Sequence, residues 1–182
     1  IADLGATNAR LAITENCESL VSKASYKMSE FKSLNQLLKH YIVENNISDF
    51  EIAGIMGVAA PVISNEVNFV NNNFSFSIKE IESSFFQKGL KVLNDVQMQT
   101  YALNNCSEDK LIKIGNEINF SSGPKILVVP GTGLGLAILI SGKSIATEAG
   151  HMNVPGNNNE IINISLIKIL LLFINPFSRW IP

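Results

Sequence analysis

The sequence is poor in cysteine, nearly neutral in charge and without a long unbroken apolar segment. Its two cysteines, Cys17 and Cys106, lie far apart and belong to no CxxC pair or Cys/His cluster, which argues against a zinc site and a disulfide framework. The formal net charge of -2 gives no electrostatic basis for binding nucleic acid or an anionic membrane surface. The sequence shows no signal-peptide pattern, and such cysteine usage is typical of a reducing compartment, so we expect a cytoplasmic protein.

The most apolar stretch, residues 161–174, is shorter than the roughly 20 residues that a transmembrane helix requires. It also carries Asn163 and Lys168, so we expect a core helix there and no membrane span. The 182 residues are 46% hydrophobic, which is enough for one ordinary domain or two small ones.

A glycine-rich loop between two apolar runs is the first distinctive feature. Ile126–Val128 lead into Pro130-Gly131-Thr132-Gly133-Leu134-Gly135, and Ala137–Ile140 follow, a pattern that predicts strand, loop and strand. Glycine lets the backbone approach a ligand, and successive N–H groups with the Thr132 hydroxyl can hold an anion such as phosphate. Taken alone, the loop is equally consistent with a hairpin turn that binds nothing.

A second loop of the same kind opens the chain. Residues 1–13 again predict a strand, a Gly/Thr turn and a strand, with Asp3 at the end of the entering strand. Neither loop is a Walker loop or a dinucleotide fingerprint, because both of those open a helix. Asp3 either holds Mg²⁺ near nucleotide phosphates, directly or through water, or caps the backbone of its own turn. Two such hairpins predict a duplicated fold that holds a nucleotide between its halves.

Between the loops, the pattern alternates between helix and strand. Apolar residues recur at helical spacing over 31–45, which predicts an amphipathic helix. Residues 50–60 are β-like, and Gly54 and Gly57 within them indicate close backbone packing. Residues 67–76 predict a loop or the tip of a hairpin.

A second helix and a strand follow. Ser77 and Glu80 fit a capping box, in which each side chain satisfies a backbone N–H of the first helical turn. We expect this helix to run to about Lys88 and to end at Gly89. Residues 90–93 then predict a short strand.

Asn94 and Asp95 follow that strand and precede residues 96–103, which read as a helix. Asp95 therefore lies at a helix N-terminus, where the macrodipole favours its ionised form. Aspartate is also a preferred N-cap, and the local sequence alone favours this purely structural role.

The polar stretch 104–123 separates these elements from the second glycine loop. We place a domain boundary near its start, which gives domains of residues 1–105 and 106–182. Because the chain opens inside an apolar run without an initiator methionine, we also expect it to be a fragment.

Glu148 and His151 stand three residues apart after the second loop, with Gly150 between them. No further His, Cys or carboxylate follows at ligand spacing, so a metal site is rejected. A polar loop that hydrogen-bonds a ligand is the preferred interpretation, and an ordinary hydrogen-bonded turn is the alternative.

Four segments together resemble the bacterial glucokinase family, the ATP-dependent glucose kinases of the actin-like ATPase (ribonuclease-H-like) superfamily. They are Asp3-Leu4-Gly5-Ala6-Thr7-Asn8-Ala9-Arg10, Leu93-Asn94-Asp95, Gly131-Thr132-Gly133-Leu134-Gly135 and Glu148-Ala149-Gly150-His151. Each is weak alone, but all four in order are specific, and the resemblance covers residues 1 to about 160. It implies an α/β, duplicated actin-like ATPase fold with a nearly complete small N-terminal domain and a truncated larger C-terminal domain.

The resemblance also implies roles for individual residues. Asp95 would be the catalytic base that accepts the proton of the sugar 6-hydroxyl during phosphoryl transfer. The residues expected to bind the sugar are Asn94, Asp95, Glu148, His151 and, from the segment 67–76, Asn71. Those expected to bind the ATP phosphates are Asp3, Gly5, Ala6, Thr7, Asn8, Gly131, Thr132, Gly133 and Gly135, with Asp3 also near Mg²⁺.

The function so implied is transfer of the ATP γ-phosphoryl group to the 6-hydroxyl of glucose, and family members are often homodimers. Ala6 replaces a usual glycine, and the chain lacks the family's further sugar-binding Glu and adenosine-binding glycine motif. A truncated non-catalytic remnant, or a sugar-binding regulator, is therefore the alternative. An NAD-binding domain is disfavoured because neither loop opens a helix. Zinc-containing sugar kinases are disfavoured because no cysteine follows Cys106.

Overall fold

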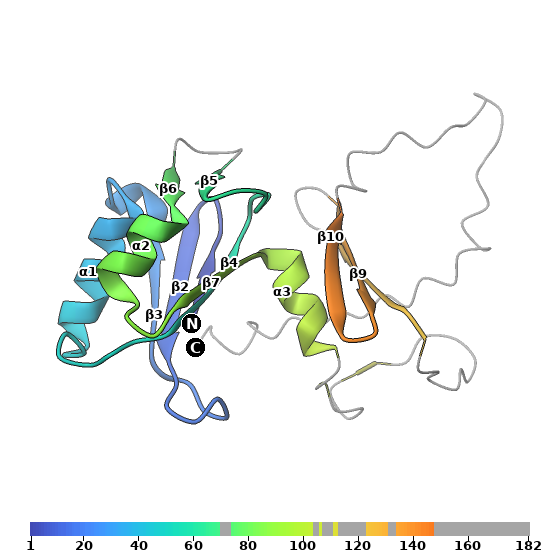
Figure 1. Ribbon diagram of the computed structural model, residues 1–182, viewed down its shortest axis with the longest axis horizontal. Coiled ribbons are helices and arrows are strands. Elements are labelled where there is room, and N and C mark those ends of the chain that lie inside the picture. The colour runs from blue at the N-terminus through green and yellow to red at the C-terminus, as the bar shows by residue number, and fades with distance from the viewer. Residues whose placement is uncertain (70–73, 104–105, 107–110, 113–122, 131–133, 148–182) are drawn as a thin grey trace. The chain divides into compact units, whose positions relative to one another are not determined.

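The computed structural model describes residues 1–69, 74–103, 106, 111–112, 123–130 and 134–147. The chain divides into two compact units, Ile1–Asp95 and Val96–Pro182, each with a sheet of its own (Figure 1). The domain limits expected from the sequence stay a prediction, because most residues around that boundary lie outside the described part.

The first unit is built on a five-stranded mixed sheet in the order β3-β2-β1-β4-β7. The strands are β1 (Ala2–Leu4), β2 (Asn8–Ile13), β3 (Val21–Lys27), β4 (Gly54–Val58) and β7 (Leu90–Asn94). β1, β2 and β3 pair antiparallel in succession, which confirms the hairpin expected over residues 1–13. β1, β4 and β7 are parallel to one another.

Two helices cover one face of this sheet (Figure 1). α1 (Leu34–Glu44) begins after Ser33, whose hydroxyl accepts a hydrogen bond from Gln36 N at 3.2 Å, and a short 3-10 helix, η1 (Met28–Glu30), precedes it. α2 (Ile78–Phe85) begins after Ser77, which caps Glu80 N at 3.4 Å as expected. α2 is shorter than predicted because the chain turns at Phe86–Gly89, where Gly89 adopts a φ of 100°.

A small antiparallel hairpin of β5 (Glu66–Asn68) and β6 (Ser75–Ser77) precedes α2. Its pairing confirms that residues 67–76 belong to a hairpin. The expected tip, with Asn71, lies outside the described residues.

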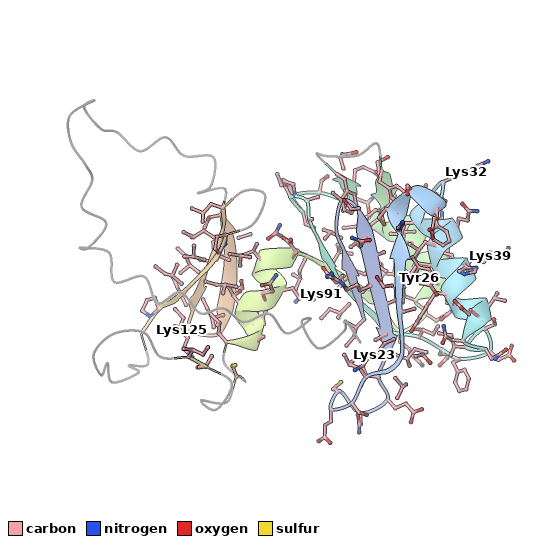
Figure 2. The ribbon with its side chains drawn as sticks, turned by 180° about the vertical axis from the view of Figure 1, so that it is seen from behind. Lys23, Tyr26, Lys32, Lys39, Lys91 and Lys125 are labelled. Carbon is pink, nitrogen blue, oxygen red and sulfur yellow. The ribbon has the colours of Figure 1, made fainter. Side chains whose placement is uncertain are left out.

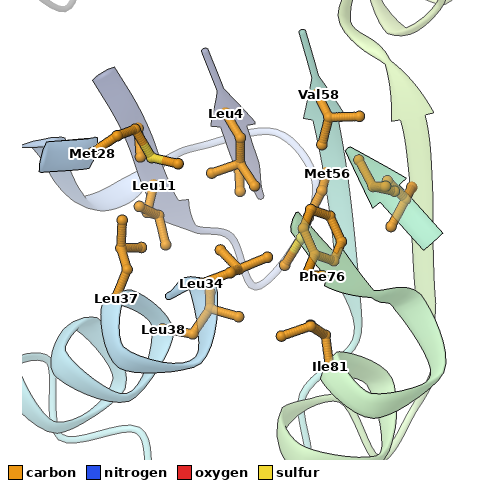
Figure 3. Packing of buried hydrophobic residues seen from close by; sticks show 14 of the residues in the cluster. Leu4, Leu11, Met28, Leu34, Leu37, Leu38, Met56, Val58, Phe76 and Ile81 are labelled. Carbon is orange, nitrogen blue, oxygen red and sulfur yellow. The ribbon is translucent and has the colours of Figure 1, made fainter. Parts of the chain in front are cut away.

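The core of the first unit lies between the sheet and these helices. Figure 3 shows Leu4 and Met56 from the strands facing Leu34 and Ile81 from α1 and α2, all with relative exposures of 1% or less. Burying a side chain of this size stabilises the fold by roughly 1.5–3 kcal/mol. Because successive side chains of a strand alternate between faces, Asp3 lies on the face turned away from this core.

Edge strand β3 is tied to α1 by tyrosines. The hydroxyl of Tyr26 donates to Glu44 Oε2 at 2.5 Å, and that of Tyr41 donates to the Ser22 carbonyl at 2.7 Å. Figure 2 shows Tyr26 lying between strand and helix, where its ring packs edge-on against His40 at a centroid distance of 5.6 Å. These contacts hold a strand whose own residues are mostly exposed.

The second unit contains α3 (Asp95–Ala102), whose first residue ends the first unit, and a three-stranded antiparallel sheet. Its strands are β8 (Lys125–Pro130), β9 (Leu134–Ile140) and β10 (Lys143–Thr147). The pairing of β8 with β9 confirms the two expected strands, while the residues between them lie outside the described part. Ser141 and Gly142, both with positive φ, form the turn into β10. Within the described residues, no helix has the length and apolar character needed to cross a bilayer. The helix expected over 161–174 lies outside them.

Candidate active site at the carboxyl ends of the parallel strands

The three parallel strands of the first unit end at the same edge of the sheet. Leu4 pairs with Val58, and Val58 pairs with Asn94, so one residue of each strand stands in a single row. Neighbouring strands lie about 4.8 Å apart, which places the ends of β1 and β7 about 10 Å from each other. Ligands of open α/β sheets bind at such carboxyl edges. The turn after β1 and the residue after β7 thus flank the end of β4.

The turn after β1 is closed by its own backbone. Gly5 N donates to the carbonyl of Asn8 at 2.9 Å, and the Thr7 carbonyl accepts from Met28 N at 2.8 Å. A Cβ at Gly5 would stand 3.2 Å from the Asn8 oxygen, so glycine suits this position. Since the Gly5 N–H is engaged, an anion at this turn would meet the exposed residues Thr7 and Asn8 first, with the half-buried Ala6 beside them.

Asp3 pairs with Arg10 across the β1–β2 hairpin. The two residues are register partners, and Arg10 Nη1 donates to Asp3 Oδ2 at 3.0 Å. Burial raises the pKa of Asp3, while the hydrogen bond and charge of Arg10 act in the opposite direction with smaller effect. The side-chain hydrogen bond of Asp3 therefore goes to the neighbouring strand and not to the backbone of its turn.

The surroundings of Asp3 suit a Mg²⁺ ion only when phosphate oxygens bind the same ion. Within the described ranges, no group of three or more His, Cys, Asp or Glu side chains could hold a metal. Mg²⁺ commonly takes one or two carboxylates together with phosphate oxygens, and Asp3 supplies one carboxylate beside the Gly5 turn. Because Arg10 engages Oδ2, the ion would be reached through Oδ1 or through water.

Asn94 and Asp95 stand at the end of β7. The Asn94 side chain donates through Nδ2 to the Ala60 carbonyl at 3.3 Å, which ties it to the turn that follows β4. Ala59 N in turn donates to the Leu4 carbonyl at 2.9 Å, so the same turn is fixed to β1. The structure thus brings Asn94, which is expected near a sugar, together with the Ala60–Pro61 turn.

Asp95 is half-buried and is the first residue of α3. The positive end of the helix dipole favours its carboxylate over the carboxylic acid. A general base must be ionised before it accepts a proton, so this position suits the role expected from the sequence.

Gly135 is not part of the second loop. It lies in β9, where it pairs with Val129, and β9 already begins at Leu134. A Cβ at Gly135 would stand 2.6 Å from Cγ2 of Val96 on α3. We expected this glycine in the loop because glycines recur throughout the motif. Its backbone instead pairs with β8 as part of β9.

The remaining expected site residues lie outside the described part of the chain, so their roles stay predictions: Asn71, Gly131, Thr132, Gly133, Glu148 and His151. Arg10 is the described residue at this site that the sequence argument did not single out. Its place directly opposite Asp3 in a tight hairpin is the signal that would have indicated the pair.

Comparison with known proteins places these features in a family. The family model described as Glucokinase matches residues 1–171. A glucokinase of Helicobacter pylori is 31% identical over 173 residues, which cover 89% of this chain and 51% of that protein. The crystal structure of a glucokinase from an Antarctic psychrotroph superposes with a TM-score of 0.71 and 24% identity, covering 87% of this chain and 52% of that one. A glucokinase of Balamuthia mandrillaris in complex with glucose gives 0.66 and 18%, covering 88% and 50%.

The two solved structures confirm the fold class expected from the sequence, the α/β fold of the actin-like ATPases. The chain spans about half the length of the curated relatives it matches. Since the family model covers all but the last residues of the chain, the protein belongs to the glucokinase family.

Proposed function

We propose that the protein transfers the γ-phosphoryl group of ATP to the 6-hydroxyl of glucose. The observation that carries this proposal is the row of Leu4, Val58 and Asn94, which puts the Gly5 turn and Asp95 at one edge of one sheet. Membership of the glucokinase family supports the choice of reaction. The glucose in the complex of the Balamuthia mandrillaris relative supports the choice of sugar.

Asp95 would act as the general base. A primary hydroxyl is a poor nucleophile, and a carboxylate within hydrogen-bonding reach orients it and takes its proton. The sugar oxygen forms the new bond to the γ-phosphorus, the bond from that phosphorus to the bridging oxygen breaks, and ADP leaves with the electron pair. The proton of the hydroxyl ends on the Asp95 carboxylate.

Asn94 would orient the sugar. Its Nδ2 donates to the Ala60 carbonyl, which fixes the amide plane and directs Oδ1 away from that bond. An amide oxygen held in this way can accept a hydrogen bond from a sugar hydroxyl next to the one that reacts.

The phosphates would lie against the turn after β1, near Thr7 and Asn8. Mg²⁺ bound together with ATP would neutralise charge on the transferring group, and Asp3 would hold it directly or through water. Gly131 to Gly133 complete the phosphate site in this proposal, with Glu148, His151 and Asn71 on the sugar. A cytoplasmic location, predicted from the cysteine usage, and a homodimer, implied by the family resemblance, remain predictions.

A sugar-binding protein without catalysis is the second candidate. The observation that favours it is the Asn94–Ala60 hydrogen bond, which orients a sugar-binding amide without involving the turn after β1. Such a protein would keep the Asn94–Ala60 arrangement and bind glucose, but it would not hold ATP productively.

Two measurements on the purified 182-residue chain separate these functions. Calorimetric titration with glucose reports binding, and a dehydrogenase-coupled assay with MgATP reports glucose 6-phosphate. 6-Deoxyglucose is the matched control, because it keeps the ring hydroxyls and lacks the one that reacts. Binding of both sugars with turnover of glucose supports the kinase. Binding without turnover supports the second candidate. A chain that neither binds nor phosphorylates glucose contradicts the site.

A further inference from the structure

α3 rests on the three-stranded sheet of its own unit through a narrow stripe of its surface. Val96, Thr100 and Leu103 have relative exposures of 9%, 0% and 8%, and they recur at the spacing of one helical face. Val96 and Thr100 are the buried residues of α3, and Leu103 directly follows its end, so these three positions determine how this segment sits on the sheet.

At the first contact of the stripe, the sheet residue that faces Val96 must lack a side chain. Val96 packs over Gly135 of β9, where an added Cβ would stand 2.6 Å from Val96 Cγ2 and at ordinary distances of 3.4 and 3.5 Å from Val129 atoms. Real Cβ contacts are not as short as 2.6 Å, and a valine in a helix has essentially one χ1 rotamer with which to yield. The φ of Gly135 is not in the left-handed region, so the constraint at this position is contact with Val96 and not backbone conformation.

The second contact of the stripe is polar and buried, since Thr100 and Ser144 have relative exposures of 0% and 9%. The hydroxyls of Thr100 and Ser144 are hydrogen-bonded to each other, with Ser144 Oγ as the donor because the single proton of Thr100 Oγ1 goes to the Gln97 carbonyl. Gln97 Nε2 donates to the Ser144 carbonyl at 3.1 Å, and Thr100 Oγ1 donates to the Gln97 carbonyl at 2.7 Å. Buried networks of hydroxyl, amide and carbonyl groups have strict geometry, so this one holds the helix in one position on β10.

We propose that Gly135, Val96, Thr100 and Ser144 are positioning residues for the Asp95 carboxylate. Asp95 is the first residue of α3, and Val96 follows it directly. The contact with Gly135 therefore fixes the helix end that carries the proposed base onto β9, the strand that leaves the second glycine loop. Gly135 serves helix packing in this assignment, and not the approach of the backbone to phosphate. The catalytic consequence rests on the proposed phosphoryl transfer, but the packing itself does not.

A pair of substitutions in the full chain tests this packing of α3 on the sheet. Gly135→Ala should lower Tm and lower kcat by about 10- to 100-fold, since small misplacements of a catalytic group have effects of this size. KM for ATP should change little. Adding Val96→Ala removes the methyl group that meets the new Cβ, so the double variant should recover most of the lost kcat and show a Tm close to that of Val96→Ala alone.

Gly142→Ala is the matched control on the same sheet. Its φ of 77° disfavours alanine, but nothing lies within 4 Å of the added Cβ, so Val96→Ala should not rescue its Tm. If Gly135→Ala instead raises KM for ATP and Val96→Ala fails to restore it, the glycine serves phosphate and the assignment is wrong. Strictly additive Tm changes for Gly135→Ala and Val96→Ala would also overturn it. Should the wild-type chain not phosphorylate glucose, the proposed function fails, while the unfolding data still decide the packing.

Discussion

The substitution Asp3→Asn measures what the Asp3–Arg10 pair contributes to the stability of the fold. The Asp3 and Arg10 side chains are 18% and 38% exposed, so this pair is partly hydrated. Pairs of this kind contribute about 1 kcal/mol or less to stability, and loss of the pair is offset because the variant no longer buries a charge. We therefore expect the free energy of unfolding at pH 7 to change by less than about 1 kcal/mol.

The pH dependence of the same variant has a definite sign. Burial raises the pKa of Asp3 above its usual 3.8, so between the two values the folded state binds more protons than the unfolded state. Wild-type stability from this group therefore falls as the pH rises through that window. The variant lacks the titration, so its stability relative to wild type should increase as the pH rises from below 3.8 and then become constant.

Urea unfolding of both proteins from acid to neutral pH measures this difference. Asp49→Asn, at an exposed position, is the control for removal of a surface charge. A loss of about 3 kcal/mol or more at pH 7 would mean that the pair behaves as a fully buried one. A relative stability that falls with pH would mean that Arg10 outweighs burial, and either result would refute the reasoning.

Three further substitutions probe the packing of the first unit. Gly54→Ala would put a Cβ 2.6 Å from ring atoms of Phe86, and it should destabilise by about 1–3 kcal/mol in thermal unfolding, so an unchanged Tm contradicts the contact. Ser77→Ala should cost about 1 kcal/mol in urea unfolding through loss of the α2 cap, more than Ser83→Ala on the same helix. Burial, with a smaller effect of Glu44, raises the pKa of Tyr41 from 10.0 to about 12, so wild-type stability should fall between these pH values while Tyr41→Phe does not share that fall. Parallel alkaline curves for the two proteins would show that Tyr41 is not responsible.

Local patterns in the sequence predicted those elements whose signals lie within a few residues. The apolar spacing over 31–45 predicted α1, and Ser77 with Glu80 predicted the start of α2. The position of Asp95 at a helix N-terminus was likewise readable, because a short strand and a helical segment adjoin it.

Features that depend on partners distant in the sequence were not predictable in this way. β3 has few apolar residues and is held by Tyr26 and Tyr41 contacts to α1, so no local pattern marks it. The row that joins Leu4 to Asn94 comes from parallel register, which a single sequence does not specify. Gly135 was expected in a loop because its contact with Val96 is invisible until helix and sheet are placed.

In the proposed function, the edge formed by the ends of β1, β4 and β7 is a sugar-phosphorylating site with Asp95 as its base. The most direct test is the ratio of glucose phosphorylation rates between the wild type and Asp95→Asn, since asparagine keeps the size and the helix-capping ability of aspartate. We expect kcat to fall by about 10²- to 10⁴-fold with Tm and glucose binding nearly unchanged. An active wild type and an Asp95→Asn variant of equal rate would contradict the account.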